Sequence, residues 1–507
     1  MSDKSAADGA PEPWAIAGNL DAQVHETHTG VVVLLGGSAY KAKKPIVTDF
    51  LDFSAPEQRE AACRHEVALN SRLAPDSYLG VAHLVSADGD TAEPVVVMRR
   101  YADALRLSCL VAAGAEVDHW LDAIARILAD FHRDAERGPT IDEQGTARAV
   151  LARWCQNLDE LQRFPGTDSD SVREIRLLVE RYVAGRADLF HTRIAQGRII
   201  DGHADLLTDD IFCPPSGPAI LDCLEFDDTL RYVDGIDDAA FLAMDLEFLG
   251  RADLAELFLD HYRRYAADPA PRSLVDFYIA YRAGVRAKVE CVRAEQGRPE
   301  AAEAARRHLE LARKHLRSGA VQLIIVGGGP GTGKSTLAHA LAPHLGAHVV
   351  STDDVRRELV DARVIEGEPG SLDAGLYAPE NVTAVYDEVL QRARRQLAQG
   401  VSVILDGTWR DPDQRSRAHH LATQMSVPAV QLTCSVSLDR ASERIRTRTT
   451  TTSDATPQIA AALAERDAQG ADGHVIDTSR PLAESVAAAQ RICRFADTAA
   501  TADTADT

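Results

Sequence analysis

Hydrophobic and polar positions follow two different patterns along the chain, and the pattern changes near residue 319. Long helical patterns dominate before this point, whereas short apolar runs and helical stripes alternate strictly after it. The apolar runs predict strands at 322–327, 347–352, 402–406, 428–434 and 473–477. Because strict alternation is typical of parallel strands joined by helical crossovers, the C-terminal part should form an α/β doubly wound sheet.

Two helices between these strands carry clear start or stop signals. Leucines recur every four residues from Leu337 to Leu345, and Gly346 then supplies a stop. Pro379 opens a later helix, which Gly400 ends. Both helices are therefore expected to serve as crossovers of the sheet.

The N-terminal part begins with a predicted hairpin. The runs VVVLLG at 31–36 and SAYKAK at 38–43 have the character of two strands. The helical pattern EQREAACRHEVALNSRL follows at 57–73, and PVVVMRRY at 94–101 predicts another strand. These segments predict a small lobe of strands with one helix, which leads into a helical lobe.

The chain is thus expected to contain two domains between two disordered ends. The start of the sequence has no apolar leader, and the end repeats small and acidic residues that cannot build a core. The predicted segments are a lead at 1–13, a first domain at 14–318 with lobes at 14–100 and 101–318, a second domain at 319–495, and a tail at 496–507.

Composition excludes several classes of protein. The 507 residues carry a formal net charge of −22, with 77 acidic and 55 basic side chains. This balance argues against nucleic acid as a partner, which would require an excess of Lys and Arg. The apolar runs are too short to span a membrane, and eight scattered cysteines without a CxxC pair indicate reduced thiols. We therefore expect a cytoplasmic protein, whose oligomeric state the sequence does not specify.

A phosphate-binding loop follows the first strand of the C-terminal part. Its spacing, Gly-x-x-x-x-Gly-Lys-Ser, allows backbone N–H groups to surround phosphate oxygens, with Lys334 at the outer phosphates and the Ser335 hydroxyl on magnesium. The alternative is a glycine turn without a ligand. The predicted ATP-binding residues of the loop are Gly328, Gly329, Pro330, Gly331, Thr332, Gly333, Lys334, Ser335 and Thr336.

Acidic residues end the next two strands. In STDDVR, residues 351–356, Asp353 is a candidate general base and Arg356 a candidate clamp for substrate or phosphate. The alternative is that Asp353 or Asp354 caps the following helix. In VSVILDGTW, Asp406 follows an apolar strand, where it is expected to organise Mg²⁺.

These C-terminal motifs resemble the small-molecule and polynucleotide kinase branch of P-loop phosphotransferases. The matching pieces are the loop, STDDVR, VILDGTW and the arginine-rich LDRASERIRTR at 438–448. The resemblance implies a lid whose arginines neutralise the transferred phosphate, and Arg444 and Arg448 share one helix face. The alternative for this pair is a solvated helix face.

The second strand of the N-terminal hairpin, SAYKAK, resembles the strand that supplies the ATP-binding lysine in protein-kinase-like folds. Period-two alternation puts Lys41 and Lys43 on one face, so one lysine could reach a cleft while the other supports it. Glu66, on the following helix, is the expected ion-pair partner. The alternative is an edge strand protected by its charges.

The stretch HADLLTDDIF, residues 203–212, resembles a kinase-type catalytic loop. The resemblance implies that Asp205 accepts the proton of the acceptor hydroxyl and that His203 braces the loop. It also implies that Asp210 and Asp222 bind metal, and that Asp238 holds the loop through hydrogen bonds.

Taken together, the motifs resemble bacterial bifunctional proteins in which an aminoglycoside phosphotransferase-like domain precedes a P-loop ATP-binding domain. The implied fold is an α+β protein-kinase-like domain followed by an α/β doubly wound P-loop domain. The chain departs from the usual HGDLHxxN pattern, since Ala204 replaces Gly, Leu207 replaces a polar residue and Asp210 replaces Asn. These changes leave open whether the N-terminal domain is catalytic.

Three functions follow from these motifs. The first is ATP- and Mg²⁺-dependent phosphate transfer to a hydroxyl of a small molecule. The second is a regulatory protein whose N-terminal domain is a degenerate ATP sensor. The third is a polynucleotide-end kinase, which the resemblance of the phosphate-loop motifs supports but the net negative charge of the chain does not.

Overall fold

The computed structural model describes residues 22–26, 30–46, 52–85, 92–368, 373–447, 456, 458, 460–461 and 473–502. It contains two compact units. The first comprises Met1–Gly114 and Asp209–Phe226, and the second comprises Ala115–Thr208 and Asp227–Thr507. The predicted lead at 1–13 lies outside the described residues.

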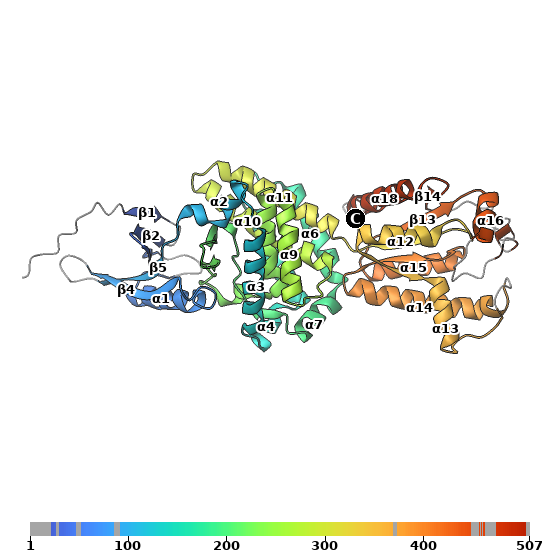
Figure 1. Ribbon diagram of the computed structural model, residues 1–507, viewed down its shortest axis with the longest axis horizontal. Coiled ribbons are helices and arrows are strands. Elements are labelled where there is room, and N and C mark those ends of the chain that lie inside the picture. Colours follow the sequence, from blue (N-terminus) through green and yellow to red (C-terminus); the bar gives the residue numbers. More distant parts are fainter. Residues whose placement is uncertain are drawn as a thin grey trace, which may run out of the picture. The chain divides into compact units, whose positions relative to one another are not determined.

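The first unit is built on a five-stranded antiparallel sheet with the order β1-β2-β3-β5-β4 (Figure 1). Helix α1 separates β3 from β4 in the sequence and packs on the sheet through Cys63. The elements are β1 (Gln23–Glu26), β2 (Gly30–Leu35), β3 (Ser38–Lys43), α1 (Pro56–Asn70), β4 (Tyr78–Val85), β5 (Ala92–Arg99), α2 (Leu107–Ala112), β7 (Ile211–Phe212) and β8 (Ala219–Ile220).

Strand β3, which carries Lys41 and Lys43, lies inside this sheet. Val32 of β2 pairs with Lys41 on one side, and Val96 of β5 pairs with it on the other. The edge-strand alternative for the two lysines is therefore wrong, because both neighbours already satisfy the backbone of β3.

The second unit begins with a helical part. Helices α3 and α9, and α10 and α11, pack in pairs (Figure 1). The elements are α3 (Asp118–Asp134), α4 (Pro139–Gln144), α5 (Ala147–Leu161), α6 (Ser169–Ala184), α7 (Ala187–Ala195), β6 (Ile199–Asp201), β9 (Tyr232–Asp234), α8 (Gly235–Phe248), α9 (Ala252–Tyr265), α10 (Arg272–Glu295) and α11 (Glu300–Ser318).

A parallel five-stranded sheet with the order β11-β12-β10-β13-β14 follows. Helices α12 and α18 pack on the sheet through Leu337, Leu341 and Cys493. The elements are β10 (Leu323–Gly327), α12 (Lys334–Leu345), β11 (Ala347–Ser351), α13 (Thr352–Asp361), α14 (Pro379–Ala398), β12 (Ser402–Asp406), α15 (Pro412–Gln424), β13 (Ala429–Ser435), α16 (Leu438–Thr447), β14 (His474–Asp477) and α18 (Leu482–Ala502).

The fold class expected from the sequence is confirmed: an α+β kinase-like arrangement of sheet and helices precedes a doubly wound P-loop sheet. The boundary near residue 319 stays a prediction. The disordered tail from residue 496 also stays a prediction, and α18 is assigned as far as Ala502.

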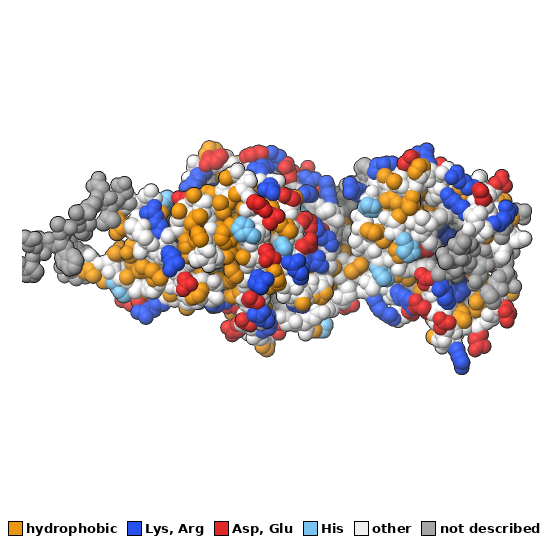
Figure 2. All heavy atoms as spheres, in the orientation of Figure 1, with side chains coloured by type: hydrophobic (Ala, Val, Ile, Leu, Met, Phe, Trp, Pro, Cys, Tyr) orange, Lys and Arg blue, Asp and Glu red, His pale blue; other side chains and the backbone are white. Residues whose placement is uncertain are grey.

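Acidic and basic side chains lie interspersed on the face of the molecule shown in Figure 2. Across the residues that the structure describes, no helix combines the length and apolar character needed to cross a membrane.

Candidate functional site

The phosphate loop, residues 328–336, runs from the end of β10 through the first turn of α12. It contains all of the predicted loop residues. Gly328 and Gly331 adopt φ angles of 134° and 74°. A Cβ at Gly328 would lie 2.6 Å from the Cys434 carbonyl oxygen, and one at Gly331 would lie 2.5 Å from that of Ala441. Both positions therefore require glycine, because a side chain would collide with the neighbouring backbone.

Lys334 and Ser335 meet Asp406 at the carboxyl edge of the parallel sheet. Lys334 Nζ donates a hydrogen bond of 3.1 Å to the Gly329 carbonyl oxygen, so the cation lies within the loop. Asp406 ends β12, the strand beside β10, and is buried. Burial raises the pKa of Asp406, while a hydrogen bond with Ser335 and the charge of Lys334 oppose the rise.

The oxygens of Asp406 and Ser335 suit a hard cation. Asp406 Oδ1 is buried and has no hydrogen-bond partner among the residues that the structure describes. No group of three or more His, Cys, Asp or Glu side chains arranged for a metal exists in that part of the chain. Mg²⁺, however, is commonly held by one or two carboxylates together with substrate phosphates. The residues present therefore fit a magnesium ion that binds with a nucleotide.

The N-cap of α13 is Ser351 rather than an aspartate. Its Oγ accepts hydrogen bonds from the backbone N–H groups of Asp353 at 3.3 Å and Asp354 at 3.4 Å. The alternative that Asp353 or Asp354 caps this helix is wrong, because the serine already supplies the acceptor. The Asp353 carboxylate instead accepts a hydrogen bond of 2.8 Å from Arg356 Nη1.

Arg356 is held between Asp353 and an aromatic ring. Its guanidinium lies 4.4 Å from the centroid of Tyr377, and the side chain is only 9% exposed. Its Nε has no hydrogen-bond partner within the described part of the chain. Ser351 pairs in register with Asp406, so β11 and β12 end at the same level and bring Asp353 and Asp406 to one edge.

Arg444, on α16, links the phosphate loop to the end of β14. Its Nη2 donates a hydrogen bond of 2.8 Å to the Thr478 carbonyl oxygen, and Thr478 Oγ1 donates one of 2.6 Å to the Thr332 carbonyl oxygen. Arg444 is therefore not part of a purely solvated helix face. Arg448, the other predicted lid arginine, lies outside the described residues.

In the first unit, both predicted lysines contact the predicted glutamate. Lys41 Nζ lies 2.8 Å from Glu66 Oε1 and 2.8 Å from Asp222 Oδ1. Lys43 Nζ lies 2.6 Å from Glu66 Oε2 and 2.7 Å from Glu225 Oε1. The structure therefore joins β3, α1 and the segment after β8 through ion pairs.

Asp210 and Asp222, the predicted metal ligands of the first unit, flank the β7–β8 hairpin. The Asp210 carbonyl oxygen accepts a hydrogen bond of 3.0 Å from the N–H of Leu221, so the two segments lie side by side. The N–H of Asp222 donates a hydrogen bond of 3.1 Å to Tyr78 Oη. Asp222 adopts a left-handed backbone, with φ of 62°, which turns this residue out of the strand direction.

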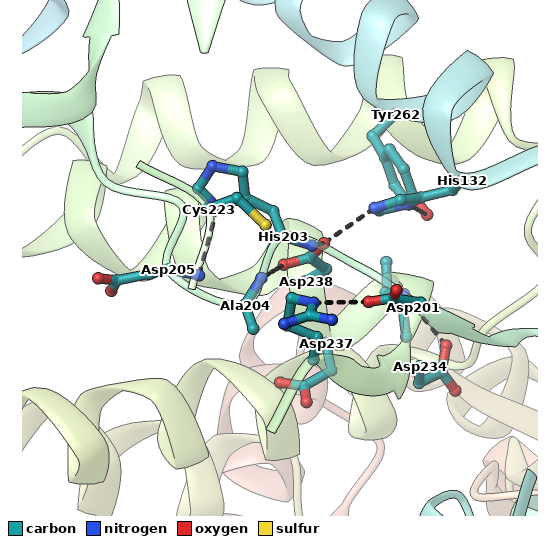
Figure 3. A network of polar contacts seen from close by, with 12 residues as sticks. His132, Asp201, His203, Ala204, Asp205, Cys223, Asp234, Asp237, Asp238 and Tyr262 are labelled. Atoms are coloured by element: carbon teal, nitrogen blue, oxygen red, sulfur yellow. Dashed lines mark hydrogen bonds and ion pairs between the residues drawn. The ribbon is translucent and has the colours of Figure 1, made fainter. Parts of the chain in front are cut away.

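Asp238 holds the first residues of the catalytic-loop stretch, which belong to the second unit (Figure 3). Asp238 accepts hydrogen bonds from the N–H of His203 at 2.7 Å and of Ala204 at 2.8 Å. His203 Nδ1 accepts one of 3.3 Å from the N–H of Asp205. The Asp205 carboxylate points away from Asp238 (Figure 3). The loop therefore presents Asp205 from a backbone held by buried hydrogen bonds.

A buried histidine and tyrosine extend this support. His132 Nε2 hydrogen-bonds with Asp238 at 3.0 Å, and its Nδ1 hydrogen-bonds with Tyr262 Oη at 2.8 Å. Burial opposes ionisation of Asp238, but the hydrogen bond and charge of His132 and the contacts with His203 hold its pKa well below the usual range. Asp238 therefore stays a carboxylate, as its role of acceptor for the loop requires.

Sequence reasoning missed Glu225, Thr478 and His132. Thr478 follows directly after the fifth parallel strand, and a polar residue at that edge was an available signal. Glu225 lies three residues after Asp222, and its local sequence carries no signal that points to Lys43. His132 ends a helix far from the loop in sequence, and nothing local marks it.

Comparison with other proteins bears on the whole chain. This chain is 55% identical over 491 residues to the uncharacterized protein Rv2004c of Mycobacterium tuberculosis. The aligned residues make up 96% of this chain and 99% of that protein. The chain belongs to the family of this protein. Residues 323–469 of this chain also match a family model, AAA_33, which is described as an AAA domain.

Solved structures that are similar to parts of the chain include two kinases. A choline/ethanolamine kinase family protein from Mesorhizobium loti is 17% identical, with 59% of this chain and 94% of that chain covered and a TM-score of 0.37. A gluconokinase from Sinorhizobium meliloti is 19% identical, with 37% and 97% covered and a TM-score of 0.25.

Proposed function

We propose that the chain is an ATP- and Mg²⁺-dependent phosphotransferase that acts on a hydroxyl group of a small molecule. The observation that carries the proposal is the arrangement at one edge of the parallel sheet. Lys334, Ser335 and Asp406 meet there beside the phosphate loop, and the Asp353–Arg356 pair ends the neighbouring strand.

Each side chain has a role that its contacts support. Lys334 leaves the Gly329 carbonyl oxygen and binds the outer phosphates of ATP, which offer it a stronger, charged acceptor. Ser335 and Asp406 would hold Mg²⁺. When bound, this ion neutralises charge on the phosphates.

Asp353 takes the proton of the acceptor hydroxyl, whose oxygen forms the new bond to the γ-phosphorus. The bond from that phosphorus to the β–γ bridging oxygen breaks, and ADP leaves. Arg356 holds the Asp353 carboxylate at 2.8 Å, which fixes its orientation toward the acceptor.

The first unit is proposed as a second ATP site, in which Lys41, Glu66, Asp210 and Asp222 would bind the nucleotide and its metal. The role of Asp205 as a base rests on the resemblance of its loop to a kinase-type catalytic loop. The ion pairs of Lys41 with Glu66 and Asp222 support nucleotide binding.

A regulatory ATP sensor is the second candidate for this domain. It is favoured by Asp210, which adds charge where Asn is usual, and by the left-handed backbone of Ala204, with φ of 67°. A polynucleotide acceptor is disfavoured by the net charge of −22. A cytoplasmic location, without a membrane partner, is part of the proposal.

Screening the full chain for ATP consumption against a library of small hydroxyl compounds tests the proposal. Lys334→Ala and Asp205→Asn variants would assign any activity to one site. A phosphorylated product, identified by mass spectrometry and lost with Lys334→Ala, is expected. ATP consumption that Lys334→Ala and Asp353→Asn leave unchanged would contradict the assignment of the C-terminal site.

A further inference from the structure

Four ion pairs of the first unit form one alternating row: Asp222, Lys41, Glu66, Lys43, Glu225. Each neighbouring pair is separated by 2.6 to 2.8 Å. Glu66 is the middle member, and its two carboxylate oxygens go to different lysines. A kinase-like ATP site requires only one lysine for Glu66, so the second lysine and its own glutamate need a separate explanation.

Burial divides the members of the row into two groups. The side chains of Lys43 and Glu66 are 1% and 0% exposed, whereas that of Asp222 is 46% exposed. A nucleotide or a metal ion can therefore approach at the Asp222 end, and Lys41 is the lysine next to it. Lys43 lies beside the buried ring of Phe53, 5.8 Å from its centroid, and is closed off from solvent.

Both lysines remain cations in this setting. Burial disfavours their charged forms, but Glu66 and Glu225 raise the pKa of Lys43, and Asp222, Glu66 and Glu225 raise that of Lys41. Two lysines therefore lie among three carboxylates. The exposed end of this row of ion pairs is Asp222, where a divalent cation would approach.

We propose that Lys43 and Glu225 are positioning residues of the N-terminal nucleotide site. Lys43 neutralises one oxygen of Glu66, so that the other oxygen holds Lys41. Glu225, bound to Lys43, anchors the segment that carries Asp222 three residues earlier. The pair thus fixes the distance between the phosphate-binding lysine and the metal-binding aspartate. The inference rests on the proposed function of this site.

The contacts also predict what each residue does when removed. Loss of Lys43 would leave Glu225 without its ion-pair partner and buried Glu66 with Lys41 alone, which should destabilise the unit as a whole. Loss of the Glu225 charge keeps Lys43 paired with Glu66, so the unit should still fold. Glu225 is therefore the position at which positioning can be separated from folding.

The test measures ATP binding by calorimetry at a series of Mg²⁺ concentrations, with the full chain in a Lys334→Ala background that silences the phosphate loop. Glu225→Gln should raise the Mg²⁺ concentration for half-maximal ATP binding about tenfold, as loss of a residue that orients a metal ligand does. Glu225→Asp, which keeps the charge, should raise it less. Lys44→Gln is the matched control, because Lys44 pairs with the exposed Glu26.

A Glu225→Gln variant with the same Mg²⁺ dependence as the Lys44→Gln control would overturn the inference, even if its melting temperature fell. A melting-temperature change alone would mark Glu225 as structural. If the Lys334→Ala background bound no ATP at any Mg²⁺ concentration, the proposed N-terminal site itself would be wrong, and the inference would fall with it.

Discussion

The backbone N–H of Ala204 donates a hydrogen bond of 2.8 Å to Asp238 Oδ1 while Ala204 adopts a left-handed φ of 67°. Arg282 Nη1 donates a hydrogen bond of 3.2 Å to the carbonyl oxygen of the same residue. An alanine in this region is strained by about 1–2 kcal/mol relative to right-handed backbone. The catalytic-loop stretch therefore holds a conformation that suits glycine.

Replacing this alanine should relieve the strain. Ala204→Gly should raise the free energy of unfolding by up to about 1 kcal/mol, since the greater flexibility of glycine offsets part of the gain. Chemical denaturation of the full chain measures the change. Gly202→Ala is the control, because its Cβ would lie 2.6 Å from Asp238 Oδ2 and should destabilise. A destabilised Ala204→Gly variant would contradict this account of the loop.

Stability should depend on pH through His315. Its ring hydrogen-bonds with Asp276 and Glu247, each at 2.8 Å. Burial disfavours the charged ring, but these two partners raise its pKa above 6.5. The contribution of His315 to the free energy of unfolding is therefore fully present below pH 6.5. It is lost as the pH rises through the folded-state pKa of the ring.

The partner Glu247 sets the acidic limit of the same contribution. Burial opposes its ionisation, but His315 and Lys314 lower its pKa to about 2, so its part is lost as the pH falls from 4.5 toward that value. His315→Gln should cost about 2 kcal/mol at pH 6, because Glu247 and Asp276 each lose a charged hydrogen-bond partner and keep only Lys314 and Arg272. Unfolding free energies from pH 5 to 9 check this, and an unchanged decline above pH 6.5 in the variant would contradict it.

Asp353 and Asp406 should affect different steps of catalysis. Asp353→Asn should leave ATP affinity almost unchanged and slow transfer by about 10²-fold or more, since a general base matters to chemistry and little to binding. Asp406→Asn should instead raise the Mg²⁺ concentration required for activity. Calorimetry and turnover measured side by side separate the two effects. Variants that only lower the melting temperature would show that both acids are structural.

Asp210 should make ATP binding by the N-terminal site dependent on Mg²⁺. Without the ion, Asp210 and Asp222 repel the phosphates, which costs several kcal/mol at an effective dielectric constant near 20 and thus about a hundredfold in affinity. Asp210→Asn should weaken the dependence. ATP affinities with Mg²⁺ and with chelator, in the Lys334→Ala background, check this. Metal-independent binding by the parent would contradict the role of Asp210.

The sequence predicted the parallel sheet well because its signals are local. The apolar runs, Pro379 and Gly346 each act within a few residues, and the observed strands start and end within one residue of the predicted positions. The cap of α13 was less predictable, because Ser351, Asp353 and Asp354 are all good capping residues and only geometry chose the serine.

The contacts that organise the candidate sites join distant segments, and no periodicity encodes them. Lys43 and Glu225 are 182 positions apart, and Thr478 and Thr332 are 146 apart. The sequence identified Lys43 as one of two lysines on a face but could not decide which is buried. That distinction requires the packing of Phe53 and α1 around β3.

ATP-dependent transfer at the phosphate loop should depend on Lys334. ATP affinity and ATP consumption of the full chain should be measured for the parent, Lys334→Ala and Lys288→Ala, whose lysine pairs with Glu160 elsewhere. Lys334→Ala should abolish the ATP consumption of the C-terminal site and its share of the ATP binding, while Lys288→Ala should behave as the parent. Unchanged affinity and turnover in Lys334→Ala would contradict the claim.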